Sequence, residues 1–193
     1  MSPSAAPDRT ADLALAERAA HGDRTAQREL FLAHRRAVHH VLFRLLGSNH
    51  EIEDVVQDAF VQAYVKLDTF QQNSKFFTWI YRIAFNAALS RRRRRRVTVS
   101  VEQSREDTGN EPESDDDAPD DRMMREERVG EVQRALLELT EDHRAILILR
   151  EMQEMAYEDI ADVLNISIGT VRSRLSRARN ALRDQLLKMQ AEP

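Results

Sequence analysis

Apolar residues recur every three or four positions in four stretches of the first half of the chain: residues 13–20, 26–46, 52–67 and 76–89. This spacing places the apolar side chains of each stretch on one side of a helix, and no sustained alternation suggests a sheet. Helix breakers separate the stretches: Gly22, then Gly47, Ser48 and Asn49, and finally a polar loop at residues 71–75. The pattern therefore predicts four helices before residue 97.

The helical spacing returns after residue 123. Two apolar stripes follow one another, at Val129, Val132, Leu136 and Leu139, and at Ala145, Ile146, Leu149 and Met152. Thr140 stands before Glu141 and Asp142, the order expected for a capping residue followed by acids at the positive end of a helix. Both stripes are interpreted as core, with no chemistry of their own.

A helix-turn-helix is predicted from residue 157 onward. The first helix has an apolar stripe at Tyr157, Ile160, Ala161 and Leu164. Asn165 tolerates the left-handed conformation that ends a helix, and the Ser167 hydroxyl can cap the next one. The second helix is expected to turn these residues inward: Ile168, Val171, Leu175, Ala178 and Leu182. Together with the two preceding helices, this motif predicts a four-helix domain.

The outward face of the second helix combines short polar residues with arginines. It carries Gly169, Thr170, Ser173, Ser176, Arg177 and Asn180, flanked by Arg172, Arg174 and Arg179. Such a face suits the major groove of DNA, where short polar side chains reach base edges and arginines bind phosphate or guanine. A merely solvated amphipathic helix is the alternative, but the preceding helix and turn favour DNA.

Composition agrees with an all-α fold of two small domains. The 193 residues include only five glycines and five prolines, and there is no cysteine. Disulfides and thiolate zinc sites are thereby excluded, which fits a cytoplasmic protein. No apolar run is long enough to span a membrane, and the N-terminus lacks the basic start and apolar core of a signal peptide.

The net charge of −4 conceals an uneven distribution along the chain. Residues 1–96 carry a net +6, residues 97–122 carry −8, and residues 123–193 carry −2. The acidic segment has almost no apolar residues after Val101 and is expected to be disordered. It is a simple tether on one hypothesis, and on another it imitates a nucleic-acid backbone. The predicted domains are residues 10–96 and 123–190, joined by a flexible linker at 97–122.

Aromatic residues gather in the fourth predicted helix, which runs directly into six arginines at residues 91–96. The aromatic positions are Phe76, Phe77, Trp79, Tyr81 and Phe85. Rings beside positive charge suit unpaired bases, which stack on flat surfaces while cations hold the backbone. Core packing and a solvated basic tail are the alternatives. Some of these rings are expected to be core, but Trp79 and Tyr81 are not expected to share the core face.

Three blocks resemble the signature segments of extracytoplasmic-function (ECF) sigma factors of bacterial RNA polymerase. They are residues 53–60 (EDVVQDAF), residues 77–86 (FTWIYRIAFN) and residues 169–179 (GTVRSRLSRAR). The resemblance implies a non-catalytic, dissociable polymerase subunit that binds two promoter elements and melts DNA. It implies no cofactor and no bound metal. It also implies these partners: core polymerase, through the clamp of its largest subunit and its flap; promoter DNA; and an anti-sigma factor.

The resemblance also assigns roles to residues. The polymerase clamp would be contacted by Asp54, Gln57 and Asp58. The minus-ten element and its melting would involve Gln71, Gln72, Asn73, Ser74, Lys75, Trp79, Tyr81, Arg82, Asn86, Arg91 and Arg92. The minus-thirty-five element would be read by Thr170, Arg172, Ser173, Arg174, Ser176 and Arg177. The free chain is expected to be a monomer without membrane insertion.

Two other classes of protein would explain part of this sequence. A one-component regulator that binds an operator as a dimer explains the helix-turn-helix, but it leaves the aromatic and basic helix unexplained. A metal-dependent helical hydrolase would use Glu51, Glu53, Asp54 and Asp58 with one of His34, His39, His40 or His50. Those carboxylates lie close together in sequence on a polar face, with no Glu-x-x-His pair converging on them.

Overall fold

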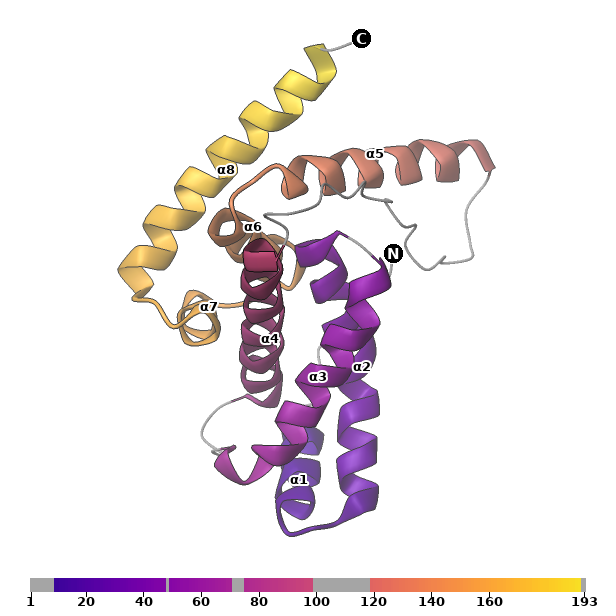
Figure 1. Ribbon diagram of the computed structural model, residues 1–193, viewed down its shortest axis with the longest axis vertical. Helices are drawn as coiled ribbons and strands as arrows, with labels where there is room; N and C mark the ends of the chain where they lie inside the picture. The colour runs from indigo at the N-terminus through magenta and orange to yellow at the C-terminus, as the bar shows by residue number, and fades with distance from the viewer. Residues whose placement is uncertain (1–8, 48, 71–74, 99–118, 192–193) are drawn as a thin grey trace. The chain divides into compact units, whose positions relative to one another are not determined.

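The computed structural model describes residues 9–47, 49–70, 75–98 and 119–191, and the regular secondary structure within them is all helical (Figure 1). The elements are α1 (Arg9–Ala20), α2 (Arg24–Leu46), α3 (Asn49–Val65), the 3-10 turn η1 (Leu67–Thr69), α4 (Phe76–Thr98), α5 (Pro119–Leu137), α6 (Glu141–Leu147), the π-helical segment η2 (Ile148–Met152), α7 (Tyr157–Leu164) and α8 (Ile168–Ala191). The predicted all-α class is confirmed. None of the described helices is long and apolar enough to cross a membrane.

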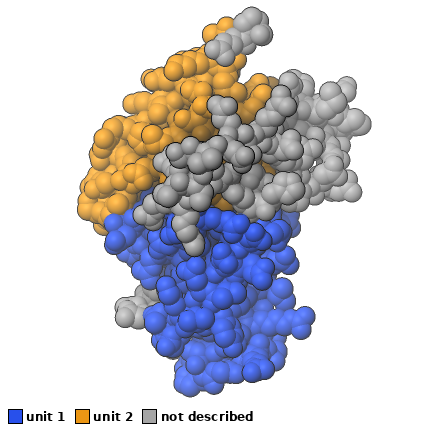
Figure 2. All heavy atoms as spheres, in the orientation of Figure 1, with its two compact units in different colours: residues 1–42, 50–104, 162–165 blue, residues 43–49, 105–161, 166–193 orange. Residues whose placement is uncertain are grey.

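The chain divides into two compact units, coloured separately in Figure 2. Unit 1 comprises residues 1–42, 50–104 and 162–165, and unit 2 comprises residues 43–49, 105–161 and 166–193. The domain boundaries at residues 10–96 and 123–190 stay predictions.

Helices enter the segment predicted as linker from both of its ends. Helix α4 continues to Thr98, and α5 begins at Pro119, while residues 99–118 lie outside the described part of the chain. Pro119 stands at the first helical position, where its fixed φ suits a helix and its missing N–H costs nothing.

Unit 1 is built around α4, which is buried on most of its sides. Almost every position from Phe76 to Ala88 is buried, with Arg82 and Asn86 as exposed exceptions. Beside it, Phe31 of α2 packs on Phe60 of α3, with ring centroids 5.3 Å apart, so these two helices lie side by side (Figure 1). A helix that contacts neighbours in several directions has no single apolar stripe.

A tight corner joins α1 to α2. Gly22 adopts a φ of 89°, a left-handed conformation that glycine reaches without strain. Asp23 then caps α2, because its Oδ1 accepts from the backbone N–H groups of Thr25 (2.9 Å) and Ala26 (3.1 Å). Its Oδ2 accepts from Arg18 Nη2 at 2.7 Å. The bond from Ala26, followed by that from Arg18, lowers the pKa of the Asp23 carboxyl below its usual value of 3.8.

Asp23→Ala should lower the thermal unfolding midpoint near neutral pH, because α2 loses its cap and Arg18 of α1 loses its ion pair with Asp23. A lowered folded-state pKa contributes stability that is present above the usual carboxyl pKa and is lost as pH falls through the lowered value. The difference between variant and wild type should therefore shrink at pH values well below 3.8. Thermal melts followed by circular dichroism across this range measure it, and a pH-independent difference would contradict it.

Unit 2 contains a fully buried arginine at the junction of α5 and α6. Arg144 is 0% exposed and donates to the carbonyls of Leu136 (2.7 Å), Leu139 (3.0 Å), Leu45 (2.6 Å) and Leu137. Three of these acceptors belong to the end of α5 and the turn after it, where helix carbonyls lack intrahelical donors. The Arg144 side chain thus completes the hydrogen bonding of a buried helix end.

Candidate nucleic-acid interface

The turn between α7 and α8 has the predicted conformation. Asn165 has a φ of 53°, and the backbone N–H of Ile166 returns to the carbonyl of Ala161 at 3.0 Å. Ser167 Oγ accepts from the backbone N–H of Thr170 at 3.1 Å and lies 2.8 Å from Thr170 Oγ1. Both predicted turn residues therefore end and begin helices as expected.

The division of α8 into an inner and an outer face is largely as predicted. Val171, Leu175 and Ala178 are buried, whereas Arg172, Ser173, Ser176 and Arg177 are exposed. The expectation for Ile168 was wrong, because this first residue of α8 is 38% exposed. Helical spacing assigns a residue to a face, but it does not show where along the helix the neighbouring elements end.

The arginines of α8 differ in their partners. Arg174 Nη1 lies 3.2 Å from Asp142 Oδ2 of α6 and is only 22% exposed. Arg179 binds Glu151 of η2 at 2.6 Å. Arg177 instead donates within its own helix, to the Ser173 carbonyl at 3.3 Å and to Ser173 Oγ at 3.4 Å. Arg174 and Arg179 thus tie α8 to its own unit, while Arg177 lies along the outer face and bonds back to Ser173 one turn earlier.

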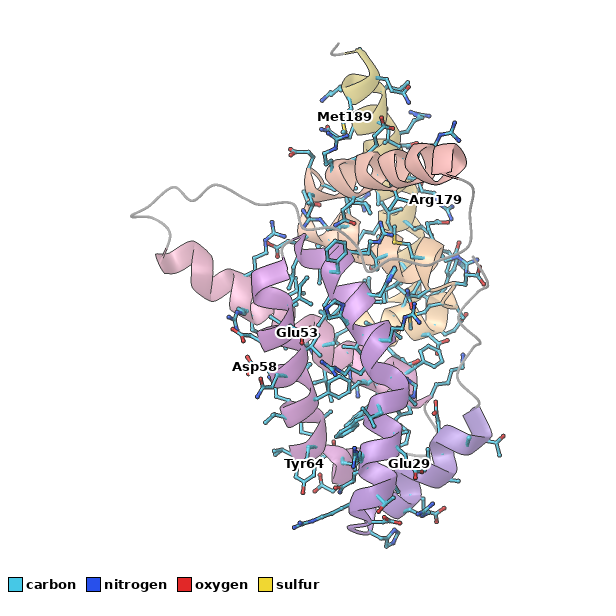
Figure 3. The ribbon with its side chains drawn as sticks, turned by 90° about the vertical axis from the view of Figure 1, so that its right-hand side faces the viewer. Glu29, Glu53, Asp58, Tyr64, Arg179 and Met189 are labelled. Atoms are coloured by element: carbon cyan, nitrogen blue, oxygen red, sulfur yellow. The ribbon has the colours of Figure 1, made fainter. Side chains whose placement is uncertain are left out.

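A second surface lies along α3 in unit 1. Asp54, Gln57 and Asp58, the predicted polymerase contacts, are all exposed and lie about one helical turn apart. Figure 3 shows Glu53, Asp58 and Tyr64 following one another along this helix. The exposed row continues into large apolar side chains that sequence reasoning did not single out: Val61, Tyr64 and Val65. Apolar residues exposed in a row are an unusual feature of a free surface.

Three acidic side chains of α3 have basic neighbours. Arg91 of α4 binds Asp54, with Nη2 2.8 Å from Oδ2, and approaches Asp58, with Nη1 3.8 Å from Oδ2. Glu53 lies 3.5 Å from Arg35 and 3.4 Å from His39, both on α2. A predicted DNA contact, Arg91, is therefore paired with two predicted polymerase contacts.

Three aromatic rings lie on both sides of the loop predicted to contact the minus-ten element. Phe70 precedes residues 71–74, and Phe76 and Trp79 follow them. The ring centroids are 5.4 Å apart for Phe70 and Phe76, 5.6 Å for Phe70 and Trp79, and 5.5 Å for Phe76 and Trp79. Mutual ring packing at such distances is favourable. The cluster therefore joins the two ends of the loop.

The predicted loop residues themselves, Gln71, Gln72, Asn73 and Ser74, lie outside the described part of the chain. Lys75 is described, and its ammonium lies 5.5 Å from the centre of the Phe77 ring. Farther along α4, Arg82 and Asn86 are exposed, and Arg92 is partly exposed like Arg91. The basic side of α4 is thus accessible, whereas its aromatic side is not.

The expectation that Trp79 and Tyr81 could not both be core was wrong. Each is only 4% exposed. Trp79 lies in the three-ring cluster, while the Tyr81 ring meets Phe77 edge-on at 6.1 Å. Burial raises the pKa of the Tyr81 hydroxyl well above its usual range. Since α4 is covered in several directions, adjacent positions are buried together, and neither ring is offered to a base in this conformation.

The carboxylates and histidines considered for a hydrolase do not converge among the described residues. No three His, Asp or Glu side chains there form a potential metal-binding group. His34 instead pairs with Asp12 of α1 at 3.1 Å in the core of unit 1.

The two surfaces correspond to the two regions of a sigma factor of the sigma-70 class. Family models described as "Sigma-70 region 2" and "Sigma-70, region 4" match residues 30–98 and 130–182. The ECF RNA polymerase sigma factor SigW of Bacillus subtilis is 33% identical over 86% of this chain and 91% of its own length. The sigma-E factor of Escherichia coli K12 is 36% identical over 89% of this chain and 92% of its own.

Two solved structures have a fold similar to that of this chain. The sigma factor RpoE of Bartonella quintana, in complex with the anti-sigma factor NepR, matches with a TM-score of 0.70 and 29% identity, over 83% of this chain and 96% of that one. CnrH in complex with the cytosolic domain of CnrY matches with a TM-score of 0.66 and 25% identity, over 95% and 99%. This chain therefore belongs to the ECF family of RNA polymerase sigma factors.

Proposed function

We propose that this sigma factor binds core RNA polymerase, recognises both promoter elements and opens the DNA at the minus-ten element. The observation that carries the proposal is the pairing of two different surfaces in one chain. Helix α8 exposes a face of serines and arginines suited to paired DNA, and α4 presents exposed basic side chains beside a loop that an aromatic cluster holds at both ends. A simple operator-binding protein needs only the first.

Polymerase docking is assigned to the exposed row of α3. Asp54, Gln57 and Asp58 supply acidic and amide groups, and Val61 and Tyr64 supply apolar area farther along the same face. A partner with basic residues beside an apolar strip would complement this row. The clamp of the largest polymerase subunit is the proposed partner. Unit 2 would contact the flap and so place α8 on the upstream promoter element.

An anti-sigma factor is the other proposed partner. The structurally similar sigma factor RpoE of Bartonella quintana is in complex with the anti-sigma factor NepR. CnrH, which is also structurally similar, is in complex with the cytosolic domain of CnrY. A protein that covered the α3 row would compete with polymerase for the same carboxylates. Since the proposed activity is exerted on polymerase, its place of action is the cytoplasm.

Reconstitution tests the proposal as a whole. The purified chain is mixed with bacterial core polymerase and a genomic DNA library, and transcript starts are mapped. We expect starts that depend on the chain and share two sequence elements upstream. A chain that instead formed a stable dimer by gel filtration, and bound duplex DNA tightly without polymerase, would contradict the sigma mechanism.

Arg177→Ala should weaken binding of the holoenzyme to the minus-thirty-five element by about 1–3 kcal/mol, because Arg177 is exposed on the outer face and, within the described part of the chain, bonds only to Ser173 of its own helix. The matched control is Arg183→Ala, which removes an exposed arginine from the same helix nearly two turns later. The loss of binding caused by Arg183→Ala should be smaller, and it should be the same for wild-type and scrambled upstream elements. Competition binding with wild-type and scrambled upstream elements distinguishes the effects of the two variants. Equal losses of binding in Arg177→Ala and Arg183→Ala would remove Arg177 from the residues proposed to read bases.

A further inference from the structure

Arg91 lies between the proposed polymerase surface and the proposed DNA surface of unit 1. Its guanidinium lies 2.8 Å from the Asp54 carboxylate and 3.8 Å from the Asp58 carboxylate, so one arginine of α4 forms ion pairs with two carboxylates of α3. The three residues come from positions that are 37 and 33 apart in the sequence. Their proximity is therefore a product of the fold.

These ion pairs are open to solvent. The side chains of Asp54, Asp58 and Arg91 are 62%, 57% and 34% exposed. Exposed pairs are weak because water solvates each charge nearly as well as its partner does. Another cation can therefore replace Arg91 at the carboxylates, and another anion can replace the carboxylates at Arg91, without stranding a buried charge.

The two replacements are linked. A guanidinium that donates to Asp54 and Asp58 has fewer donors left for a DNA phosphate, and carboxylates that accept from Arg91 attract a basic partner less strongly. If a basic group of polymerase forms ion pairs with Asp54 and Asp58, Arg91 loses its pairs with them and becomes available to a phosphate. By reciprocity, a phosphate that takes Arg91 exposes the carboxylates to polymerase.

We infer that Arg91 is an intramolecular counter-ion that couples polymerase docking to promoter binding. In the free chain it lowers the affinity of α3 for polymerase, and the carboxylates lower the affinity of α4 for DNA. In the holoenzyme, basic groups of polymerase occupy Asp54 and Asp58, and Arg91 binds the promoter backbone. This inference rests on the proposed function, because it takes its two partners from there.

Glu53 of α3 provides a control with the same charge as Asp54 and Asp58. Glu53 is the neighbouring acid on α3, with a side chain 63% exposed, close to those of Asp54 and Asp58. It faces Arg35 and His39 of α2, away from Arg91. Removing its charge changes the net charge of α3 by the same amount as removing that of Asp54, but it leaves the Arg91 pairs in place.

The first measurement is affinity for core polymerase without DNA. Arg91→Gln should raise the affinity of the full chain by about two- to fivefold, the range set by an exposed ion pair. Arg36→Gln removes an exposed arginine elsewhere in unit 1 and should have no such effect. Unchanged or weaker binding by Arg91→Gln would overturn the coupling. The docking proposal is tested separately: if Asp54→Asn with Asp58→Asn leaves polymerase affinity intact, docking itself is misassigned.

The second measurement is affinity of the free chain for a short oligothymidylate, a probe for phosphate binding in any sequence. Asp54→Asn with Asp58→Asn should raise it about two- to fivefold, although neither residue is a DNA contact. The gain should disappear when Arg91→Gln is added. If Glu53→Gln gives the same gain per charge removed, or if the gain survives Arg91→Gln, the effect is general repulsion and the inference fails.

Discussion

Arg144→Met should lower the free energy of unfolding of the C-terminal helices by about 3–5 kcal/mol, since each buried acceptor that loses its donor costs about 1–3 kcal/mol. Four carbonyls accept from this one side chain, those of Leu136, Leu137, Leu139 and Leu45. The Leu136 carbonyl also accepts from the backbone N–H of Leu139 at 3.1 Å, so it keeps a donor when Arg144 is removed. Methionine fills similar volume but donates nothing. The change therefore tests hydrogen bonding at the helix end more than packing.

Hydrogen exchange of the full chain, resolved by peptide, localises this effect. Amides of α5 and α6 should lose protection in Arg144→Met, while those of α2 before Leu42 should change far less. Arg134→Met removes an exposed arginine from α5 and should shift stability by no more than about 0.5 kcal/mol. Wild-type protection of α5 and α6 in Arg144→Met would show that water or other donors satisfy the carbonyls.

Nothing in the sequence identified Arg144 as a core residue. It stands directly before the apolar stripe of Ala145, Ile146 and Leu149, and a charged residue at such a position is ordinarily assigned to the surface. Its burial depends on carbonyls at the end of another helix, which become visible only when α5 and α6 are packed. The Thr140 cap, by contrast, was predictable, because the Thr140 hydroxyl accepts from the N–H of His143 only three residues away.

The same distinction explains the two helices that are proposed to contact DNA. The faces of α8 followed from periodicity, because its buried side is a single stripe at Val171, Leu175 and Ala178. Periodicity failed on α4, where several neighbours bury adjacent positions such as Trp79 and Tyr81 together. The bridge from Arg91 to Asp54 was also beyond the sequence, since the spacing along two separate helices does not show which side chains meet.

Trp79→Ala should lower the free energy of unfolding of unit 1 by about 3–5 kcal/mol, the usual result of deleting a large buried ring. Trp79 is 4% exposed and packs against Phe70 and Phe76, one on each side of residues 71–74. Trp79→Phe keeps a ring in the cluster and should lose much less. Urea unfolding followed by circular dichroism measures both, and a loss near 1 kcal/mol for Trp79→Ala would contradict core packing.

The burial of Trp79 also changes how it would support promoter opening. A ring inside the cluster would act on the loop ends at Phe70 and Phe76, holding the loop ready for a base, without stacking on DNA itself. Trp79→Phe, which is expected to fold, should therefore slow open-complex formation more than it weakens the closed complex, because the loop is proposed to act only in the open complex. Equal effects on both would reduce Trp79 to a structural residue.

Fluorescence of Trp79 decides between indirect and direct action, because it is the only tryptophan in the chain. If the ring remains in the cluster, saturating the free protein with single-stranded minus-ten DNA should leave the short emission wavelength of a buried indole unchanged. A base stacked on the ring would quench it strongly, since stacking requires the ring to leave the core and meet the base face to face. Strong quenching would therefore overturn the indirect role and make Trp79 a DNA contact in its own right.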